Sequence, residues 1–342
     1  MNPFASARTL VSGRTALVGA AVLGALALVN YAAARRAERR HPPQGRFIEV
    51  DGVRLHYTDR GTGTPVVLVH GNAVTGDDYD TSGVAGRLLG NHRVIIFDRP
   101  GFGHSQRPHG RLWTAAEQAE LLHRALGRLG VERPVVVGHS WGAIVALALA
   151  ARHPADTAGL VLLSGYYFWT LRPDVLLVVP GAIPVLGDIL RHTVSPWLGR
   201  LMMPLLKRGM FSPLPVPPRF RADYSDAMAL RPSQIRATSM DGALMIPGAL
   251  MNHGSYADLS MPVVIMAGAA DKVVFARSAR RLQARIPGSV LRIVEGAGHM
   301  VHYAVPGQVA EMVERLAQAT PEALRPQPPL RRAVPEGSAR AA

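Results

Sequence analysis

The stretch Val135-Val-Val-Gly-His-Ser-Trp-Gly142 decides the fold of this chain. Three valines lead directly into Gly138-His-Ser140-Trp-Gly142, and the Ala- and Leu-rich segment that follows has the composition of a helix. A G-x-S-x-G sequence between a strand and a helix is typical of a tight turn that holds its serine in a strained position. The pattern predicts Ser140 as a nucleophile at a helix N-terminus, where partial positive charge favours an anion. The alternative is a turn serine without chemistry.

A serine hydroxyl needs a base, and the base needs an orienting carboxylate. Asp271 and His299 each directly follow an apolar run of strand length, and 28 residues separate them, which leaves room for one helix and one strand. Loops beyond the carboxyl ends of parallel strands are where open α/β sheets place their sites. The sequence therefore predicts a triad of Ser140, His299 and Asp271. The alternatives are a helix-capping role for Asp271, a structural role for His299, and His302 as the base.

The anion that forms when serine attacks a carbonyl needs two backbone N–H donors. Trp141, directly after the nucleophile, is expected to supply one. The other is expected from the loop His70-Gly71-Asn72-Ala73, which follows the apolar run Val66–Val69. We predict the amide of Asn72 as the donor, with that of Ala73 as the second choice and a plain turn as the alternative.

Apolar runs on both sides of this turn predict a parallel sheet. Eight runs have strand length: Phe47–Val50, Val53–Thr58, Val66–Val69, Val94–Phe97, Val135–Val137, Leu160–Leu163, Val263–Met266 and Val290–Val294. Most are continuously apolar, which is typical of strands buried on both faces. Helical stretches separate most of them: Trp113–Leu129, Trp141–Arg152 and Phe275–Ile286. This alternation predicts a mostly parallel sheet with helices on both faces.

Two segments depart from the alternation. Residues 165–259 are rich in Pro, Met and Leu, which predicts an inserted cap of irregular helices over the sheet. Residues 321–342 are dominated by Pro, Arg and Ala without periodicity, which predicts a disordered tail.

Five motifs in order resemble the α/β-hydrolase fold family. They are His70-Gly71-Asn72, Asp98-Arg-Pro-Gly-Phe-Gly-His-Ser105, Gly138-His-Ser-Trp-Gly142, Gly268-x-x-Asp271 and Gly298-His299. The resemblance covers Phe47 to Ala319, and it implies an eight-stranded, mostly parallel sheet, a helical cap after the sixth strand, and no cofactor or metal.

His-Gly-Asn paired with Gly-His-x-Trp-Gly is similar to haloalkane dehalogenases and their epoxide-hydrolase relatives, in which the nucleophile is an aspartate. Ser140 stands at that position here. Dehalogenation needs a carboxylate that forms a hydrolysable alkyl ester, so the serine favours acyl chemistry, with Asn72 and Trp141 as oxyanion donors.

These features predict an enzyme that cleaves a carboxylic ester, or a thioester or amide, through an acyl-Ser140 intermediate. The expected substrate is a small apolar ester, because the cap is rich in apolar side chains. One alternative is acyl transfer to an acceptor other than water. Another is a catalytically silent protein that binds a lipid or a partner.

The N-terminal segment bears on localisation. Thr15 to Ala34 carries no charge over about twenty residues, enough to span a bilayer as a helix, and four arginines follow it. We predict an uncleaved membrane anchor, with a cleaved signal peptide or a buried helix as alternatives. The arginine cluster after the span favours a cytoplasmic catalytic domain. The predicted parts are therefore residues 1–40 with the anchor, the catalytic domain 41–320, and the tail 321–342.

The net charge of +14 raises the question of nucleic acid, yet the arginines are scattered and form no stripe interleaved with aromatic residues. We therefore expect no nucleic-acid partner and instead an affinity for anionic membrane surfaces. The chain has no cysteine, which excludes disulfides and thiolate chemistry. Nothing in the sequence indicates an oligomeric state.

Overall fold

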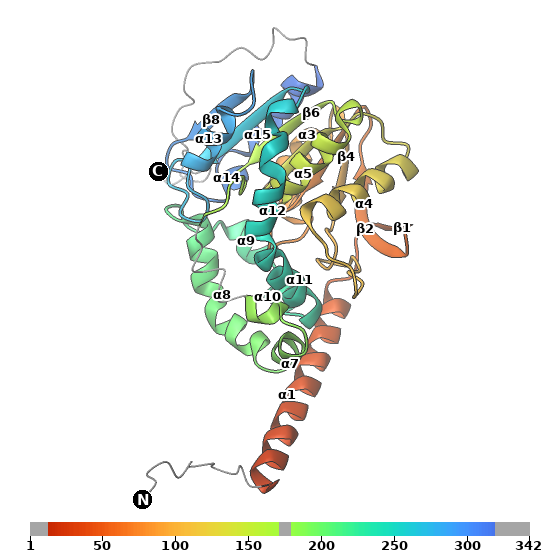
Figure 1. The fold of residues 1–342 in the computed structure, drawn as a ribbon, viewed down its shortest axis with the longest axis vertical. Helices are drawn as coiled ribbons and strands as arrows, with labels where there is room; N and C mark the ends of the chain where they lie inside the picture. The colour runs from red at the N-terminus through yellow and green to blue at the C-terminus, as the bar shows by residue number, and fades with distance from the viewer. Residues whose placement is uncertain (1–12, 171–178, 319–342) are drawn as a thin grey trace, which may run out of the picture.

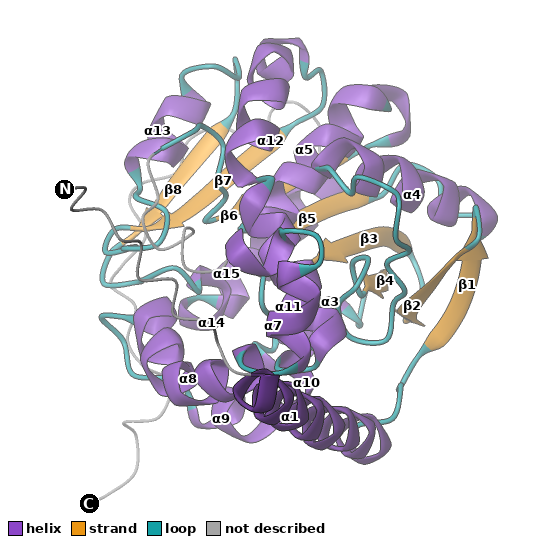
Figure 2. Ribbon diagram, turned by 60° about the horizontal axis from the view of Figure 1, so that its bottom comes forward, coloured by secondary structure: helices purple, strands orange, loops and turns teal. Residues whose placement is uncertain are grey.

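A computed structural model describes residues 13–170 and 179–318 and contains one eight-stranded sheet with helices on both faces (Figures 1 and 2). The strands are β1 (Arg46–Val50), β2 (Val53–Arg60), β3 (Thr64–Val69), β4 (His92–Phe97), β5 (Val135–His139), β6 (Gly159–Leu163), β7 (Val263–Gly268) and β8 (Val290–Val294). Their order in the sheet is β1-β2-β4-β3-β5-β6-β7-β8. The strands β3 to β8 are parallel, and β1 and β2 pair antiparallel at one edge. The predicted mostly parallel, eight-stranded α/β fold is confirmed.

The sheet is buried on both faces, as its apolar strands require. Successive residues of β3 point to opposite sides, so Val67 belongs to one core cluster while Val66 and Leu68 belong to the other. The first cluster lies under α4 (Ala115–Arg128), α5 (Trp141–Arg152) and α13 (Arg277–Gln283), and the second under α3 (Val84–Leu88) and α15 (Pro306–Ala317). Shorter helices complete this part: α2 (Asp78–Thr81), η1 (Pro154–Asp156) and α14 (Val301–Ala304).

Some helices begin or end a few residues away from the predicted positions, because a capping side chain fixes the first turn. Helix α4 begins at Ala115 and not at Trp113, because the side chain of Thr114 accepts a hydrogen bond from the amide of Glu117 and so caps the first turn. Asp51 and Gly52, between β1 and β2, both have positive φ (51° and 72°), the geometry of the predicted tight hairpin.

The segment between β6 and β7 is helical and forms a cap beside the sheet (Figures 1 and 2). Its elements are η2 (Val179–Ala182), α7 (Leu186–His192), α8 (Ser195–Phe211), α9 (Pro218–Asp223), α10 (Asp226–Ala229), α11 (Pro232–Ala243), α12 (Met245–Asn252) and η3 (His253–Asp258). Phe211 and Phe220 of the cap pack with Val74 and Met300 of the sheet domain in a small core of their own. The predicted tail, residues 321–342, lies outside the described residues.

The N-terminal helix α1 (Gly13–Arg40) projects from the body beside the cap (Figure 1). Within the described part of the chain it is the one helix long and apolar enough to cross a membrane, and only 6% of its apolar window is buried. The polar interruption of that window, Asn30, is itself buried, and its amide donates hydrogen bonds to the carbonyls of His192 and Thr193 at 2.8 and 2.7 Å. The predicted N-terminal apolar helix is therefore present, and Asn30 ties it to the cap.

Candidate active site

Ser140 occupies a strained turn between the central strand β5 and helix α5. Its backbone has φ 53°, in the left-handed region that non-glycine residues rarely adopt. Close approach makes glycine necessary around it: a Cβ on Gly142 would lie 2.1 Å from the carbonyl oxygen of Val69, and one on Gly71 would lie 3.2 Å from the Cβ of Ser140. The turn therefore holds the serine against the loop after β3, at the first position before α5.

The structure brings the three residues of the predicted triad together. Ser140 Oγ lies 3.0 Å from His299 Nε2, and His299 Nδ1 lies 2.9 Å from Asp271 Oδ2. His299 and Asp271 are 5% and 3% exposed, whereas Ser140 is only half-buried and so remains accessible. These distances are hydrogen-bond distances, and they join a hydroxyl, an imidazole and a carboxylate in the order that serine activation needs.

Backbone contacts fix the orientation of Asp271. Its Oδ1 accepts hydrogen bonds from the amides of Val273 and Val274, both at 2.8 Å. Because Oδ1 is occupied, only Oδ2 faces His299. The carboxylate thus favours the tautomer in which Nδ1 carries the proton and Nε2 is free to accept one.

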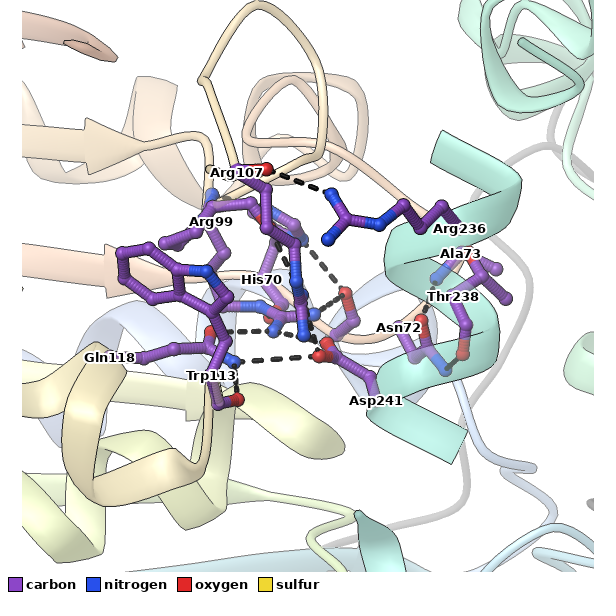
Figure 3. Close-up of polar contacts among 12 residues, drawn as sticks. His70, Asn72, Ala73, Arg99, Arg107, Trp113, Gln118, Arg236, Thr238 and Asp241 are labelled. Carbon is purple, nitrogen blue, oxygen red and sulfur yellow. Dashed lines mark hydrogen bonds and ion pairs between the residues drawn. The ribbon is translucent and has the colours of Figure 1, made fainter. Parts of the chain in front are cut away.

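The loop after β3 presents backbone amides next to the elbow. The amide of Ala73 donates to the side chain of Asn72 at 2.9 Å, so it is already occupied. Among the described residues the amides of Asn72 and of Trp141, the first residue of α5, have no acceptor. This favours Asn72 over Ala73 as the partner of Trp141. The side chain of Asn72 points to the cap and donates to the carbonyl of Thr238 in α11 at 3.2 Å (Figure 3).

A buried histidine and a buried arginine hold this loop in place. His70 Nδ1 lies 2.8 Å from the carbonyl of Gly71, and His70 Nε2 accepts from the amide of Arg99 at 2.9 Å. Arg99 in turn donates to the carbonyls of His70 and Gly71. Burial, followed by the charge of Arg99, lowers the pKa of His70 from 6.5 to about 4, so this imidazole is neutral near pH 7.

A cluster that the sequence did not predict connects the loop to the cap. Asp241 of α11 is fully buried and accepts from Arg99 at 2.7 Å and from Arg107 at 2.8 Å (Figure 3). Gln118 of α4 accepts from Arg99 at 2.9 Å and donates to Asp241 at 3.4 Å. Both arginines precede α4 in the loop after β4. Asp241 is the one acid in α11, which gives no sequence signal of its partners, and only the tertiary structure shows that it meets two arginines more than a hundred residues away.

Two groups of side chains have donors close enough to hold a metal ion. Asp78, His139 and His302 form a buried group, and His123, His153 and Asp156 form a partly exposed one. In the first group Asp78 already accepts from Tyr303 at 2.7 Å and lies 2.8 Å from His302 Nε2. We therefore interpret this group as a hydrogen-bond network that supports the loop carrying His299.

A serine in a strand–helix elbow, with an Asp and a His in the loops after two later strands of the same parallel sheet, here β7 and β8, defines the class of α/β hydrolases. A sequence model described as "Alpha/beta hydrolase family" matches residues 66–312. The chain belongs to this family. The match confirms the predicted family.

Relatives of known name agree with this assignment. "Haloalkane dehalogenase 2" of Mycobacterium tuberculosis is 33% identical over 155 residues, 44% of this chain and 53% of that protein. The chain thus spans about half the length of this curated relative. "2-hydroxy-6-oxo-2,4-heptadienoate hydrolase" of Pseudomonas putida is 29% identical over 75% of this chain and 90% of that protein. Among solved structures, a membrane phospholipase A is 21% identical with a TM-score of 0.62, over 89% of this chain and 95% of that chain, which shows a shared fold.

Proposed function

We propose that this chain is a serine hydrolase that cleaves a carboxylic ester through an acyl-Ser140 intermediate. The observation that carries the proposal is the hydrogen-bonded series from Ser140 Oγ to His299 at 3.0 Å and from His299 to Asp271 at 2.9 Å. The relatives are named after different substrates, a haloalkane and 2-hydroxy-6-oxo-2,4-heptadienoate, so we base the chemistry on the nucleophile. A serine favours acyl transfer, because an acyl-serine can be hydrolysed and an alkyl-serine ether cannot.

In the proposed reaction, His299 Nε2 accepts the proton of Ser140 as Oγ attacks the ester carbonyl carbon. The carbonyl oxygen becomes an anion and receives hydrogen bonds from the amides of Trp141 and Asn72. His299 then gives the proton to the leaving alcohol, and the acyl-serine forms. Water, deprotonated by the same imidazole, releases the acid and restores the serine. Asp271 stabilises the imidazolium in both halves of the reaction.

Apolar side chains near the elbow support an apolar acyl group. Tyr166, Tyr167 and Phe168, directly after β6, are buried, and a Cβ on Gly248 of the cap would lie 3.9 Å from the ring of Trp141. The cap helix α12 therefore covers the elbow. Several neighbouring α/β hydrolases of known structure are esterases, and one is a membrane phospholipase A.

The test is a series of p-nitrophenyl esters with acyl chains of increasing length, together with labelling by a fluorophosphonate probe. Each buried methylene contributes roughly 0.8 kcal/mol, so three added carbons should raise kcat/KM about fiftyfold until the site is full. Equal turnover of acetyl and octanoyl esters would exclude an apolar acyl site. Absence of probe labelling at Ser140 would exclude the serine mechanism.

We also propose that α1 anchors the protein in a membrane, with the catalytic domain on the cytoplasmic side. The exposure of its apolar window supports this, as do the buried contacts of its C-terminal turns: Ala37 is 2% exposed, and Glu38 pairs with Arg231 at 3.1 Å. The full chain should stay in the membrane fraction after washing with high salt and with carbonate. Release by salt would show an electrostatic attachment only, and a mature N-terminus near Arg35 would favour a signal peptide.

A further inference from the structure

A cavity that no triad residue lines lies at the C-terminal end of α1. Its volume is about 920 Å³, and its walls come from α1, the hairpin of β1 and β2, the loop of residues 101–109, α7 and the start of α11. No member of the triad lines it. The cavity is therefore available for a ligand other than the ester substrate.

The charge of the lining is strongly positive. Six arginines contribute to it: Arg35, Arg54, Arg107, Arg191, Arg231 and Arg236. Glu38, the one carboxylate in the lining, is shared by Arg35 and Arg231 at 3.3 and 3.1 Å. Asp241 and Asp188 pair with two more of the arginines from outside the lining. Six guanidinium groups against three carboxylates, of which Asp241 also pairs with Arg99, leave a surplus of at least three positive charges.

Some of these arginines have donors without an acceptor. Arg54 and Arg236 have no carboxylate partner among the described residues, and Arg54 stacks on the ring of Phe47 at 4.5 Å. The side chain of Arg107 is only 2% exposed, yet its Nε and Nη2 have no hydrogen-bond partner in the described structure. Burial and the charges of Arg191 and Arg107 lower the pKa of Arg236. Those two nitrogens of Arg107 have no exposed surface, so an anion in this cavity would instead meet Arg54 and Arg236, which lack a carboxylate partner.

The position of the cavity indicates which anion it would meet. Arg35 lies in its lining and is the first residue after the apolar run Thr15–Ala34. If α1 spans a bilayer, Arg35 lies where the helix leaves the hydrocarbon, at the depth of the lipid headgroups. Clustered guanidinium groups bind phosphate oxygens with paired, charge-assisted hydrogen bonds.

We propose that this cavity binds the phosphate headgroup of an anionic lipid. The proposal rests on the membrane attachment proposed above and is independent of the acyl chemistry at Ser140. The headgroup would pair with Arg54 and Arg236, the lining arginines that lack a carboxylate partner.

The test uses the full chain in a neutral maltoside detergent with Ser140→Ala, so that no ester is consumed. Binding of dihexanoyl phosphatidic acid is measured by calorimetry, beside dihexanoylglycerol and inorganic phosphate. The double variant Arg54→Gln/Arg236→Gln is compared with Arg277→Gln/Arg285→Gln, which removes the same charge from the start of α13 and from the turn that follows this helix. The control is matched, because Arg277 stacks on Phe275 at 4.8 Å as Arg54 does on Phe47.

Phosphatidic acid should bind more tightly than either other ligand, and Arg54→Gln/Arg236→Gln should weaken it at least tenfold, about the loss expected for two charge-assisted contacts, with no change in the control pair. Thermal melting of both double variants reports that the fold is kept. Equal affinity in the two double variants, or equal binding of dihexanoylglycerol, would overturn the proposal. If inorganic phosphate binds as tightly as phosphatidic acid and both are weakened by Arg54→Gln/Arg236→Gln, the lipid assignment is wrong and the ligand is a soluble phosphate compound. Release of the full chain by carbonate would contradict the membrane anchor on which this proposal rests, and that experiment does not depend on the binding measurements.

Discussion

Two buried carboxylates, Asp271 in the sheet domain and Asp241 in the cap, have opposite partners. Asp271 faces His299, an imidazole that can gain and lose a proton, whereas Asp241 faces Arg99 and Arg107, which stay charged. Asp271 can take part in a reaction, because the charge of its partner His299 changes. Asp241 can only hold the cap to the loop that carries Asn72. Both residues are buried carboxylates, so it is the side chain paired with each, an imidazole or a guanidinium, that determines whether the role is chemical or structural.

The largest effect on kcat should come from substitution of Ser140, the residue that contacts His299. Ser140→Ala removes one oxygen and leaves both carboxylate pairs intact, so kcat should fall by about 10⁶ while the thermal midpoint stays near that of the wild type. The control is Ser164→Ala, since Ser164 also has positive φ (45°) and is buried at the end of the neighbouring strand β6. It should keep probe labelling. Ester hydrolysis at the wild-type rate in Ser140→Ala would show that Ser140 is not the nucleophile.

The next effect isolates the orienting role of Asp271. In Asp271→Asn, Oδ1 can still accept from the amides of Val273 and Val274, which leaves the side-chain NH₂ facing His299. That group cannot accept from Nδ1, so the imidazole adopts the tautomer that cannot take the serine proton, and kcat should fall about 10⁴-fold. Steady-state kinetics and a melting curve together check this. Activity within tenfold of the wild type would mean that another group orients His299.

Asp241→Asn should differ from Asp271→Asn, because it should lower the free energy of unfolding more than it lowers the catalytic rate. It leaves Arg99 and Arg107 buried without their carboxylate, and breaking such a pair typically costs about 3–5 kcal/mol. Asp156→Asn is the matched control, because its side chain is 59% exposed and pairs only with His123; such pairs contribute at most about 1 kcal/mol. Denaturant unfolding of the full chain in detergent compares the two. A similar, small loss in both variants would show that the cluster does not hold the cap.

The sequence was sufficient for the fold and for the elements that carry Ser140, Asp271 and His299, since these residues stand in local patterns at strand ends. The positions of Asp241 and Asn30 could not be predicted in the same way. Asn30 is a single polar residue in an apolar segment and Asp241 is the one acid of a mixed helix, and the partners of both lie more than a hundred residues away in the chain. Hydrophobic periodicity predicts which face is buried but not which polar groups meet there. The basic cavity was missed for the same reason, because its arginines come from five separate segments.

The smallest effect concerns pH and the histidine beside Arg99. The folded-state pKa of His70 is about 4, below its ordinary value of 6.5. Between these two values the unfolded chain binds more protons than the folded one, so stability is fully present above pH 6.5 and is lost as the pH falls toward 4. At pH 5 the loss from this group should be about 2 kcal/mol. His70→Gln removes the titrating group, so melting curves of the two proteins between pH 7.5 and pH 5 should show a shallower decline for the variant. Parallel declines would mean that His70 does not carry this pH dependence, and that the loop next to the elbow is held by Arg99 and Asp241 alone.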